Sequence, residues 1–85
     1  MNDIEWKYKA RKQLKKIPAT YQAAIVEAVD TLQCDRKDWR NVIELKNHQY
    51  DYRLRVGRYR VLFNFEAAIE IVTIEEVKKR DERTY

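Results

Sequence analysis

Apolar residues in the first half of the chain recur at the spacing of α-helices. Within residues 8–17 the apolar positions share one helical face, and Lys and Arg fill most of the remaining surface. These apolar positions are Ala10, Leu14 and Ile17. Pro18 ends this predicted helix, because the residue before a proline is disfavoured in the helical region. A second helix is predicted over residues 20–33 with Thr20 as its cap, and the two helices form an antiparallel hairpin.

After Glu44 the apolar period changes to the two-residue alternation of β-strands. Two alternating runs flank Gly57 in the segment YRLRVGRYRVLF, residues 52–63. A two-residue turn at Gly57 and Arg58 predicts three apolar pairs facing each other on one side of a hairpin. These pairs are Val56 with Tyr59, Leu54 with Val61, and Tyr52 with Phe63.

The remaining segments complete an α+β arrangement. A third strand is predicted over residues 69–77, although its double-glutamate end also fits a helix, and a short strand is predicted at IEW, residues 4–6. The polar segment 34–41 is predicted to be a loop whose Trp39 packs under the edge of the sheet. We expect a single domain over residues 1–85, with an antiparallel sheet of the N-terminal strand and a three-strand meander, and the helical hairpin on one face.

Composition narrows the class of protein. The 85-residue chain is 45% hydrophobic and has a single Gly and a single Pro, which is unlike a disordered segment or a linker. Cys34, the single cysteine, cannot form an internal disulfide. The first residues contain no apolar run of the length that a signal peptide needs, and no segment approaches membrane-spanning length. We therefore expect a soluble cytoplasmic protein with no cofactor, no metal site and no membrane partner.

The arginines of the predicted hairpin carry the clearest chemical signal. Their register places Arg53, Arg55 and Arg60 on the face opposite the core, with Arg55 directly across from Arg60. Like charges that face each other across a ladder destabilise a sheet by roughly 0.2–1 kcal/mol. The arrangement favours a surface kept for an anion, because the planar fork of arginine matches phosphate oxygens. Alternatively, these side chains are solvated or pair with carboxylates of neighbouring segments.

The C-terminal segment KKRDERTY, residues 78–85, follows the third strand and is expected to reach the same face. Its cations are Lys78, Lys79, Arg80 and Arg83. It ends in Tyr85, an aromatic residue that can stack on an unpaired base. Together with the arginine face this segment predicts a site for single-stranded RNA, although a solvated charge run would also explain it.

The order of a short strand, two helices, YRLRVGRYRVLF and a closing KKRDERTY resembles the RelE/ParE superfamily of toxins from type II toxin–antitoxin systems, and the RelE branch most closely. The resemblance covers nearly the whole chain, and its most specific part is the R-x-R-V-G-x-Y-R hairpin followed by a basic segment ending in Tyr. It implies a RelE-like fold and a ribosome-dependent mRNA interferase, which cleaves mRNA in the ribosomal A site and inhibits translation. The implied partners are a cognate antitoxin, the ribosome with its RNA, and mRNA.

The resemblance also implies roles for individual residues. The implied catalytic set is Arg55, Arg60, Arg80 and Tyr85. RNA binding is assigned to Arg53, Arg58, Lys78, Lys79 and Arg83. Lys79 or Arg83 is an alternative to Arg80 as the working tail residue.

RNA cleavage of this kind needs no metal, because the 2′-hydroxyl attacks the adjacent phosphate and leaves a cyclic phosphate and a 5′-hydroxyl. Arg60 and Arg80 are expected to hold the non-bridging oxygens, a role whose loss typically lowers a rate by about 10²–10³. Tyr85 is a candidate for base stacking or proton transfer, and His48 is either a second proton-transfer candidate or an exposed loop residue. Two other functions stay open: a ParE-like toxin that inhibits DNA gyrase without nuclease activity, and an inactive RNA-binding relative.

Overall fold

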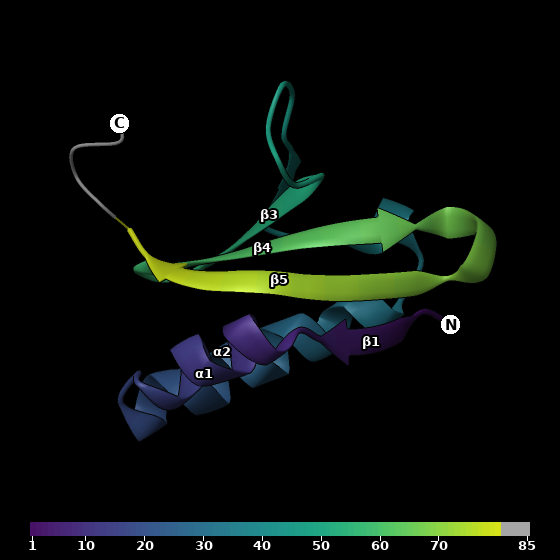
Figure 1. Ribbon diagram of the computed structural model, residues 1–85. Coiled ribbons are helices and arrows are strands. Elements are labelled where there is room, and N and C mark those ends of the chain that lie inside the picture. Colours follow the sequence, from purple (N-terminus) through teal and green to yellow (C-terminus); the bar gives the residue numbers. More distant parts are fainter. Residues whose placement is uncertain (81–85) are drawn as a thin grey trace.

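The computed structural model describes residues 1–80 as a layer of helices on one face of a sheet (Figure 1). The sheet has five strands in the order β1-β5-β4-β3-β2. Its elements are β1 (Asp3–Trp6), α1 (Tyr8–Lys15), α2 (Ala19–Asp30), β2 (Val42–Glu44), β3 (Tyr52–Val56), β4 (Tyr59–Glu66) and β5 (Ile71–Lys79). Short 3-10 turns lie at Thr31–Gln33, Arg36–Asp38 and Ala67–Ile69. Within residues 1–80, both helices lie on the same side of the sheet, and the other side carries no helix.

The predicted α+β class and the helical hairpin are confirmed, but the start of the second helix is not where the sequence placed it. The backbone N–H groups of Tyr21 and Gln22 both donate to the carbonyl oxygen of Pro18, at 2.9 and 3.0 Å. The first turn of α2 therefore closes directly onto Pro18, and Thr20 lies inside the helix instead of capping it. In the described part of the chain, neither helix is long and apolar enough to cross a membrane.

Two strand pairings differ from the expected antiparallel meander. β1 pairs with β5 in parallel, which becomes possible because both helices and the other strands intervene between them along the chain. β2 is an additional edge strand, antiparallel to β3, and its 3 residues are too few to show an alternating pattern. β5 begins at Ile71, after the predicted start, because a 3-10 turn and Glu70 with a φ of 53° reverse the chain first.

The predicted register of the β3–β4 hairpin is confirmed in every pair, and Arg55 lies opposite Arg60. Gly57 has a φ of 57°, whereas Arg58 is not among the residues with positive φ. This is the pattern of a type II′ turn with glycine at its first central position, a turn whose twist matches that of a hairpin. The turn thereby directs the three predicted apolar pairs to the helices and the arginines of both strands to the other face, where Leu62 lies opposite Arg53.

The core lies between the helices and the sheet. Its fully buried side chains are Phe63, Ile25, Leu32, Leu54, Ile74, Val29, Val61 and Val72. Trp39 makes edge-on contacts with the rings of Tyr52, Phe63 and Phe65, which confirms that it packs against the sheet. Its indole N–H donates to the carbonyl oxygens of Leu32 and Cys34, at 3.2 and 3.1 Å, so the polar end of the ring is satisfied.

A β-bulge in β5 preserves the two-sided character of the sheet. The register of β4 against β5 shifts after Leu62, which leaves Glu75 as an extra residue. Ile74 and Val77 are therefore both buried in the core, although strict alternation would direct one of them outward. Beyond the bulge, Lys78 is paired with Arg60, on the face opposite the core.

We expect Gly57→Ala to lower the free energy of unfolding by about 1–2 kcal/mol, because an L-residue is disfavoured at positive φ. A methyl group there would meet no atom within 4 Å, so the loss would come from the backbone alone. Urea unfolding followed by tryptophan fluorescence measures it, with Arg58→Ala at the adjacent turn position as the control. Equal stability of both variants would contradict the assigned turn.

Candidate nucleic-acid interface

The sheet face opposite the helices carries a row of cations. Arg55 on β3, Arg60 on β4 and Lys78 on β5 are cross-strand neighbours, and Arg53 lies in the adjacent row. The backbone N–H of Arg80 donates to the carbonyl oxygen of Arg58 at 2.6 Å, which extends the β4–β5 pairing past the end of β5. By strand alternation Arg80 lies on the same side as Lys78.

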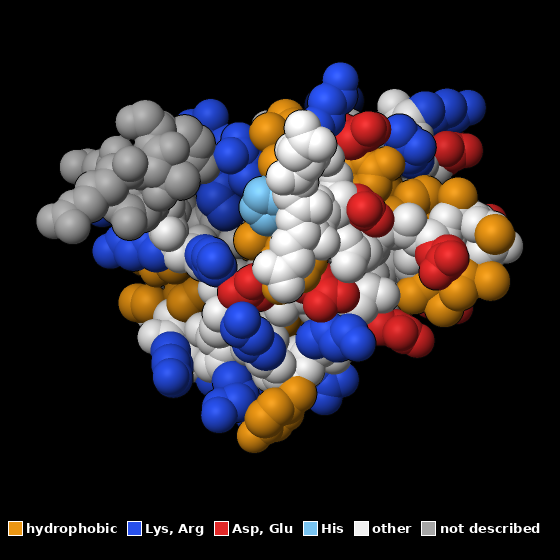
Figure 2. All heavy atoms as spheres, turned by 45° about the horizontal axis from the view of Figure 1, so that its top comes forward, with side chains coloured by type: hydrophobic (Ala, Val, Ile, Leu, Met, Phe, Trp, Pro, Cys, Tyr) orange, Lys and Arg blue, Asp and Glu red, His pale blue; other side chains and the backbone are white. Residues whose placement is uncertain are grey.

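We call this surface the arginine face; it consists of Arg53, Arg55, Arg60, Lys78 and Arg80. Figure 2, which brings the top of Figure 1 forward, shows Lys and Arg side chains gathered on this side of the molecule. Three adjacent strands thus bring like charges together, as the sequence predicted. Such an arrangement costs stability unless an anion or a carboxylate balances it.

Arg60 is buried to an extent that the sequence did not predict. Only 7% of the residue is exposed. Its Nη1 donates to the carbonyl oxygens of Gly57 and Tyr59, both at 3.0 Å, while its buried Nε has no partner among the described residues. The guanidinium is therefore bent back over the hairpin turn, where it helps to hold the turn as well as charging the face.

The other predicted residues are placed in different ways. Arg55 and Arg58 are exposed, on β3 and in the turn. Lys79 pairs with Tyr59, a core residue, so the prediction that Lys79 reaches the arginine face is wrong: strand alternation directs it to the opposite side. Arg83 and Tyr85 lie outside the described residues.

A buried carboxylate, Glu76, lies beside the arginine face and was not predicted. The residue is 5% exposed. Its Oε2 accepts a hydrogen bond from the hydroxyl of Tyr50 at 2.8 Å, and its Oε1 accepts one from Nε2 of Gln13 at 3.4 Å. The Nζ atoms of Lys9 and Lys78 lie 3.3 and 3.6 Å from the same Oε1. We call these five residues the Glu76 cluster.

The cluster shifts the proton affinity of both acidic groups. Burial alone would raise the pKa of Glu76, but the hydrogen bonds from Tyr50, Lys9 and Gln13 and the charge of Lys78 hold it below its ordinary value. The hydrogen bond to Glu76, with burial as a further cause, raises the pKa of Tyr50 to about 12. Glu76 is thus an anion and Tyr50 a neutral donor at neutral pH, which keeps the hydrogen bond between them intact.

The Tyr50 side chain reaches Glu76 from the loop of residues 45–51, which stands above β3 on the side away from the helices (Figure 1). The backbone N–H of Leu45 donates to the carbonyl oxygen of Asp51 at 2.8 Å and closes the base of this loop. The backbone N–H of Tyr50 donates to Nδ1 of His48 at 3.1 Å. In the neutral ring, His48 therefore carries its proton on Nε2, and its side chain is exposed.

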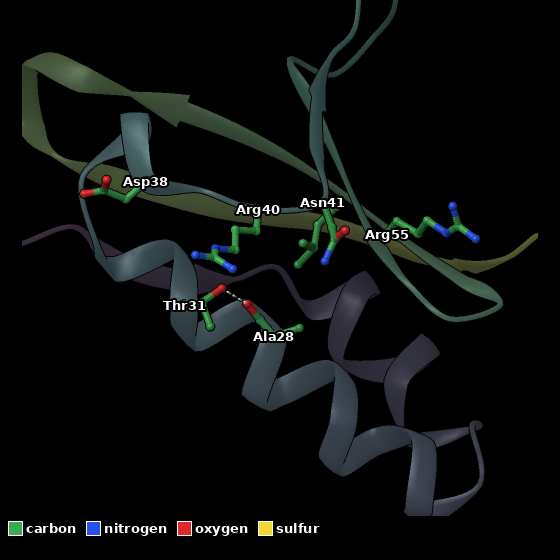
Figure 3. A pocket seen from close by; sticks show the side chains of 7 residues that line it. Ala28, Thr31, Asp38, Arg40, Asn41 and Arg55 are labelled. Carbon is green, nitrogen blue, oxygen red and sulfur yellow. Dashed lines mark hydrogen bonds between the residues drawn. The ribbon is translucent and has the colours of Figure 1, made fainter.

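A hollow of about 340 Å³ lies between β3 and α2, on the helix side of the sheet (Figure 3). It is lined by Ala28, Thr31, Asp38, Arg40, Asn41, Leu54 and Arg55. Arg40 points toward α2, whereas Arg55 points away from α2. Arg55 thus lies between this hollow and the arginine face. Among residues 1–80, no three His, Cys, Asp or Glu side chains are grouped so that they could hold a metal ion.

The sequence matches the family model of the ParE toxin of the type II toxin–antitoxin system parDE over residues 4–83. The chain belongs to this toxin family. Its resemblance to the RelE/ParE superfamily is thereby confirmed. No curated protein matches the sequence significantly.

Solved structures show the same fold in RelE toxins. A chain of the archaeal RelE–RelB complex from Pyrococcus horikoshii has a TM-score of 0.79 at 24% identity, over 95% of this chain and 97% of that chain. The toxin–antitoxin complex RelBE2 from Mycobacterium tuberculosis gives 0.77 at 27% identity, over 93% and 98%. The isolated E. coli RelE toxin gives 0.74 at 16% identity, over 96% and 87%. The family model is thus that of ParE, whereas these structural neighbours are RelE proteins or their complexes.

We expect the Tyr50→Phe variant to lose less stability than the parent as the pH rises into the alkaline range. The pKa of Tyr50 rises from 10.0 to about 12 on folding, so its contribution to stability is present below pH 10 and is lost as the pH rises through 12. Between these pH values, the free energy of unfolding of the parent should fall more steeply than that of Tyr50→Phe in urea titrations. Tyr8→Phe, at a residue that is 75% exposed, is the matched control. Parallel curves for parent and Tyr50→Phe would contradict the assigned hydrogen bond.

Proposed function

We propose that this toxin is a ribosome-dependent mRNA endoribonuclease that cleaves mRNA in the A site and is neutralised by a cognate antitoxin. The observation that carries the proposal is the row of Arg55, Arg60 and Lys78 across three strands of the helix-free face. A row of like charges lowers the stability of the sheet. A bound phosphodiester would neutralise these charges, which explains why they are placed together. The likeness to solved RelE structures supports the same conclusion.

The proposed reaction is attack of the 2′-hydroxyl on the adjacent phosphate, which breaks the bond to the 5′-oxygen and leaves a cyclic phosphate. Arg55 and Lys78 are exposed and can approach the non-bridging oxygens directly. Arg60 lies deeper, where its charge is less screened by water. Arg80 contributes from the end of β5, while Arg53 and Arg58 hold the neighbouring backbone. Such preorganised charge stabilises the negative charge that develops on the phosphorane.

Proton transfer is assigned to Tyr85 or His48, since arginine gives up its proton reluctantly near neutral pH. Arg83 is proposed to bind RNA from the same C-terminal segment as Tyr85. Without a strong acid and base of its own, the enzyme depends on a host site to orient the substrate, and the ribosome supplies that orientation. The proposed activity would therefore be confined to translated mRNA.

The antitoxin is proposed to act by covering the arginine face with acidic side chains. The P. horikoshii and M. tuberculosis structures are toxin–antitoxin complexes, which supports a protein partner of this kind. Charge complementarity across such an interface would speed association and exclude RNA at the same time.

A second candidate function is inhibition of DNA gyrase without nuclease activity. The observation that favours it is the match to the ParE family model over residues 4–83. A supercoiling assay with purified gyrase separates the two functions. Inhibited supercoiling with intact mRNA would replace the nuclease proposal, whereas uninhibited supercoiling with cleaved mRNA would support it.

We expect Arg55→Ala to lower the rate of mRNA cleavage on the ribosome by on the order of 10², with the free energy of unfolding changed by less than about 0.5 kcal/mol. Arg55 is exposed, so its loss removes charge from the face without opening the core. Primer extension in a purified translation system measures cleavage. Arg40→Ala is the matched control, because Arg40 is also exposed and points toward α2. Cleavage by Arg55→Ala at the parent rate would refute the assignment.

For Arg60→Ala we expect loss of cleavage together with a fall of about 1–2 kcal/mol in the free energy of unfolding, because two hydrogen bonds to the turn are lost. The protein should nevertheless stay folded at room temperature. Cleavage and urea unfolding are measured on the same preparation. Full activity of a folded Arg60→Ala variant would exclude Arg60 from the catalytic set.

A further inference from the structure

Helix α1 is joined to the end of β5 that β1 leaves unpaired. β1 pairs with β5 only as far as Ile74. Beyond that point Oε1 of Gln13 accepts a hydrogen bond from the backbone N–H of Val77 at 2.7 Å, so a side chain of α1 takes the place of a neighbouring strand. This contact brings the first turn of α1, with Lys9, next to the arginine face.

Two lysines from distant parts of the chain meet at a single carboxylate oxygen there. Nζ of Lys9 and Nζ of Lys78 lie 3.3 and 3.6 Å from Oε1 of Glu76. The lysine side chains are 64% and 55% exposed, whereas that of Glu76 is 7% exposed. Glu76 therefore holds the two lysine side chains from the protein interior, and both side chains remain accessible to a ligand from the solvent.

The carboxylate itself is not available to a ligand. Its Oε2 is occupied by the Tyr50 hydroxyl at 2.8 Å, and its Oε1 by Gln13 and the two lysines. Two positive charges against one negative charge leave the cluster cationic, and Arg60 lies directly across from Lys78. Ion pairs with such exposed lysines contribute little to stability, so stability alone does not account for a buried glutamate here.

We propose that Glu76 is a positioning residue that holds Lys9 and Lys78 as a pair of phosphate-binding groups, extending the RNA site from the sheet onto α1. The ligand is the phosphodiester backbone of single-stranded RNA, and this choice of ligand rests on the proposed function. Tyr50 fixes the orientation of the carboxylate by occupying its second oxygen. Lys9 thereby joins a site whose other residues all lie in the second half of the chain.

The test is the binding of a fluorescent single-stranded RNA whose riboses carry 2′-O-methyl groups, so that it cannot be cleaved. Anisotropy titrations over a series of salt concentrations give the affinity and its salt dependence. Lys9→Ala should weaken binding about fivefold and lower the slope of log K against log salt by about 0.7, the value for one phosphate contact. Lys15→Ala, the same change on the same helix but away from Glu76, should leave both unchanged.

Glu76→Gln separates positioning from simple electrostatics. Removing a negative charge beside the RNA would by itself tighten binding, whereas loss of the lysine positions weakens it. We expect weaker binding, and we expect Lys9→Ala to have little further effect in the Glu76→Gln background. The Lys9→Arg variant, which keeps the positive charge, should bind RNA as tightly as the parent. If Glu76→Gln does not fold, Tyr50→Phe, which keeps the carboxylate but frees one oxygen, is expected to weaken binding in the same direction.

Tighter binding by Glu76→Gln, equal binding by Lys9→Ala and Lys15→Ala, or no salt-dependent binding by the parent would each overturn the inference. The proposed function can fail separately. A parent that binds the 2′-O-methyl RNA through Lys9 but leaves translated mRNA intact would refute the nuclease and keep the inference. A parent that cleaves mRNA but binds without Lys9 would refute the inference alone.

Discussion

The register of the β3–β4 hairpin is the constraint on which the rest of the structure depends. With the turn at Gly57 and Arg58, the three apolar pairs of the hairpin face the helices and the arginines of both strands face away. A slip of one residue would exchange the two faces, burying arginines in the core and exposing Leu54 and Val61. Core and arginine face are therefore two results of one pairing, and the sheet cannot form its core without also assembling the site.

The bulge at Glu75 sets which side chains of β5 face the core and which face away from it. If the strand alternated without a bulge from Ile74 onward, Val77 would face outward and Lys78 would face the core. With it, β5 contributes apolar side chains to one layer and Lys78 to the other. The bulge also places Glu76 where Tyr50, α1 and Lys78 converge, so the acidic residue that is buried beside the arginine face comes from the irregular part of the strand.

The sequence allowed the hairpin and its arginine row to be predicted, because alternation around a single glycine leaves one register that places three apolar pairs on the same side. The bulge was not predictable in this way, since Ile74 and Val77 break the alternation and no local signal says where the extra residue sits. The partners of Glu76 were missed for a different reason: Lys9 and Gln13 are more than sixty positions away in the sequence, and only the tertiary packing of α1 against β5 joins them. Alternation likewise gave the direction of Arg60 but not its bonds to the turn. Family membership was recognisable from the sequence. The choice between RNA and gyrase as the target was not, because toxins of both kinds share this fold.

The arginine face is proposed to cleave mRNA that is bound to the ribosome. The most direct measurement is primer extension on one defined mRNA incubated with the protein, either free or paused on purified ribosomes. We expect cuts within the codon that occupies the A site of the ribosome-bound message, and we expect the free message to stay intact. Intact message in both samples, from a protein that arrests growth, would contradict the proposal.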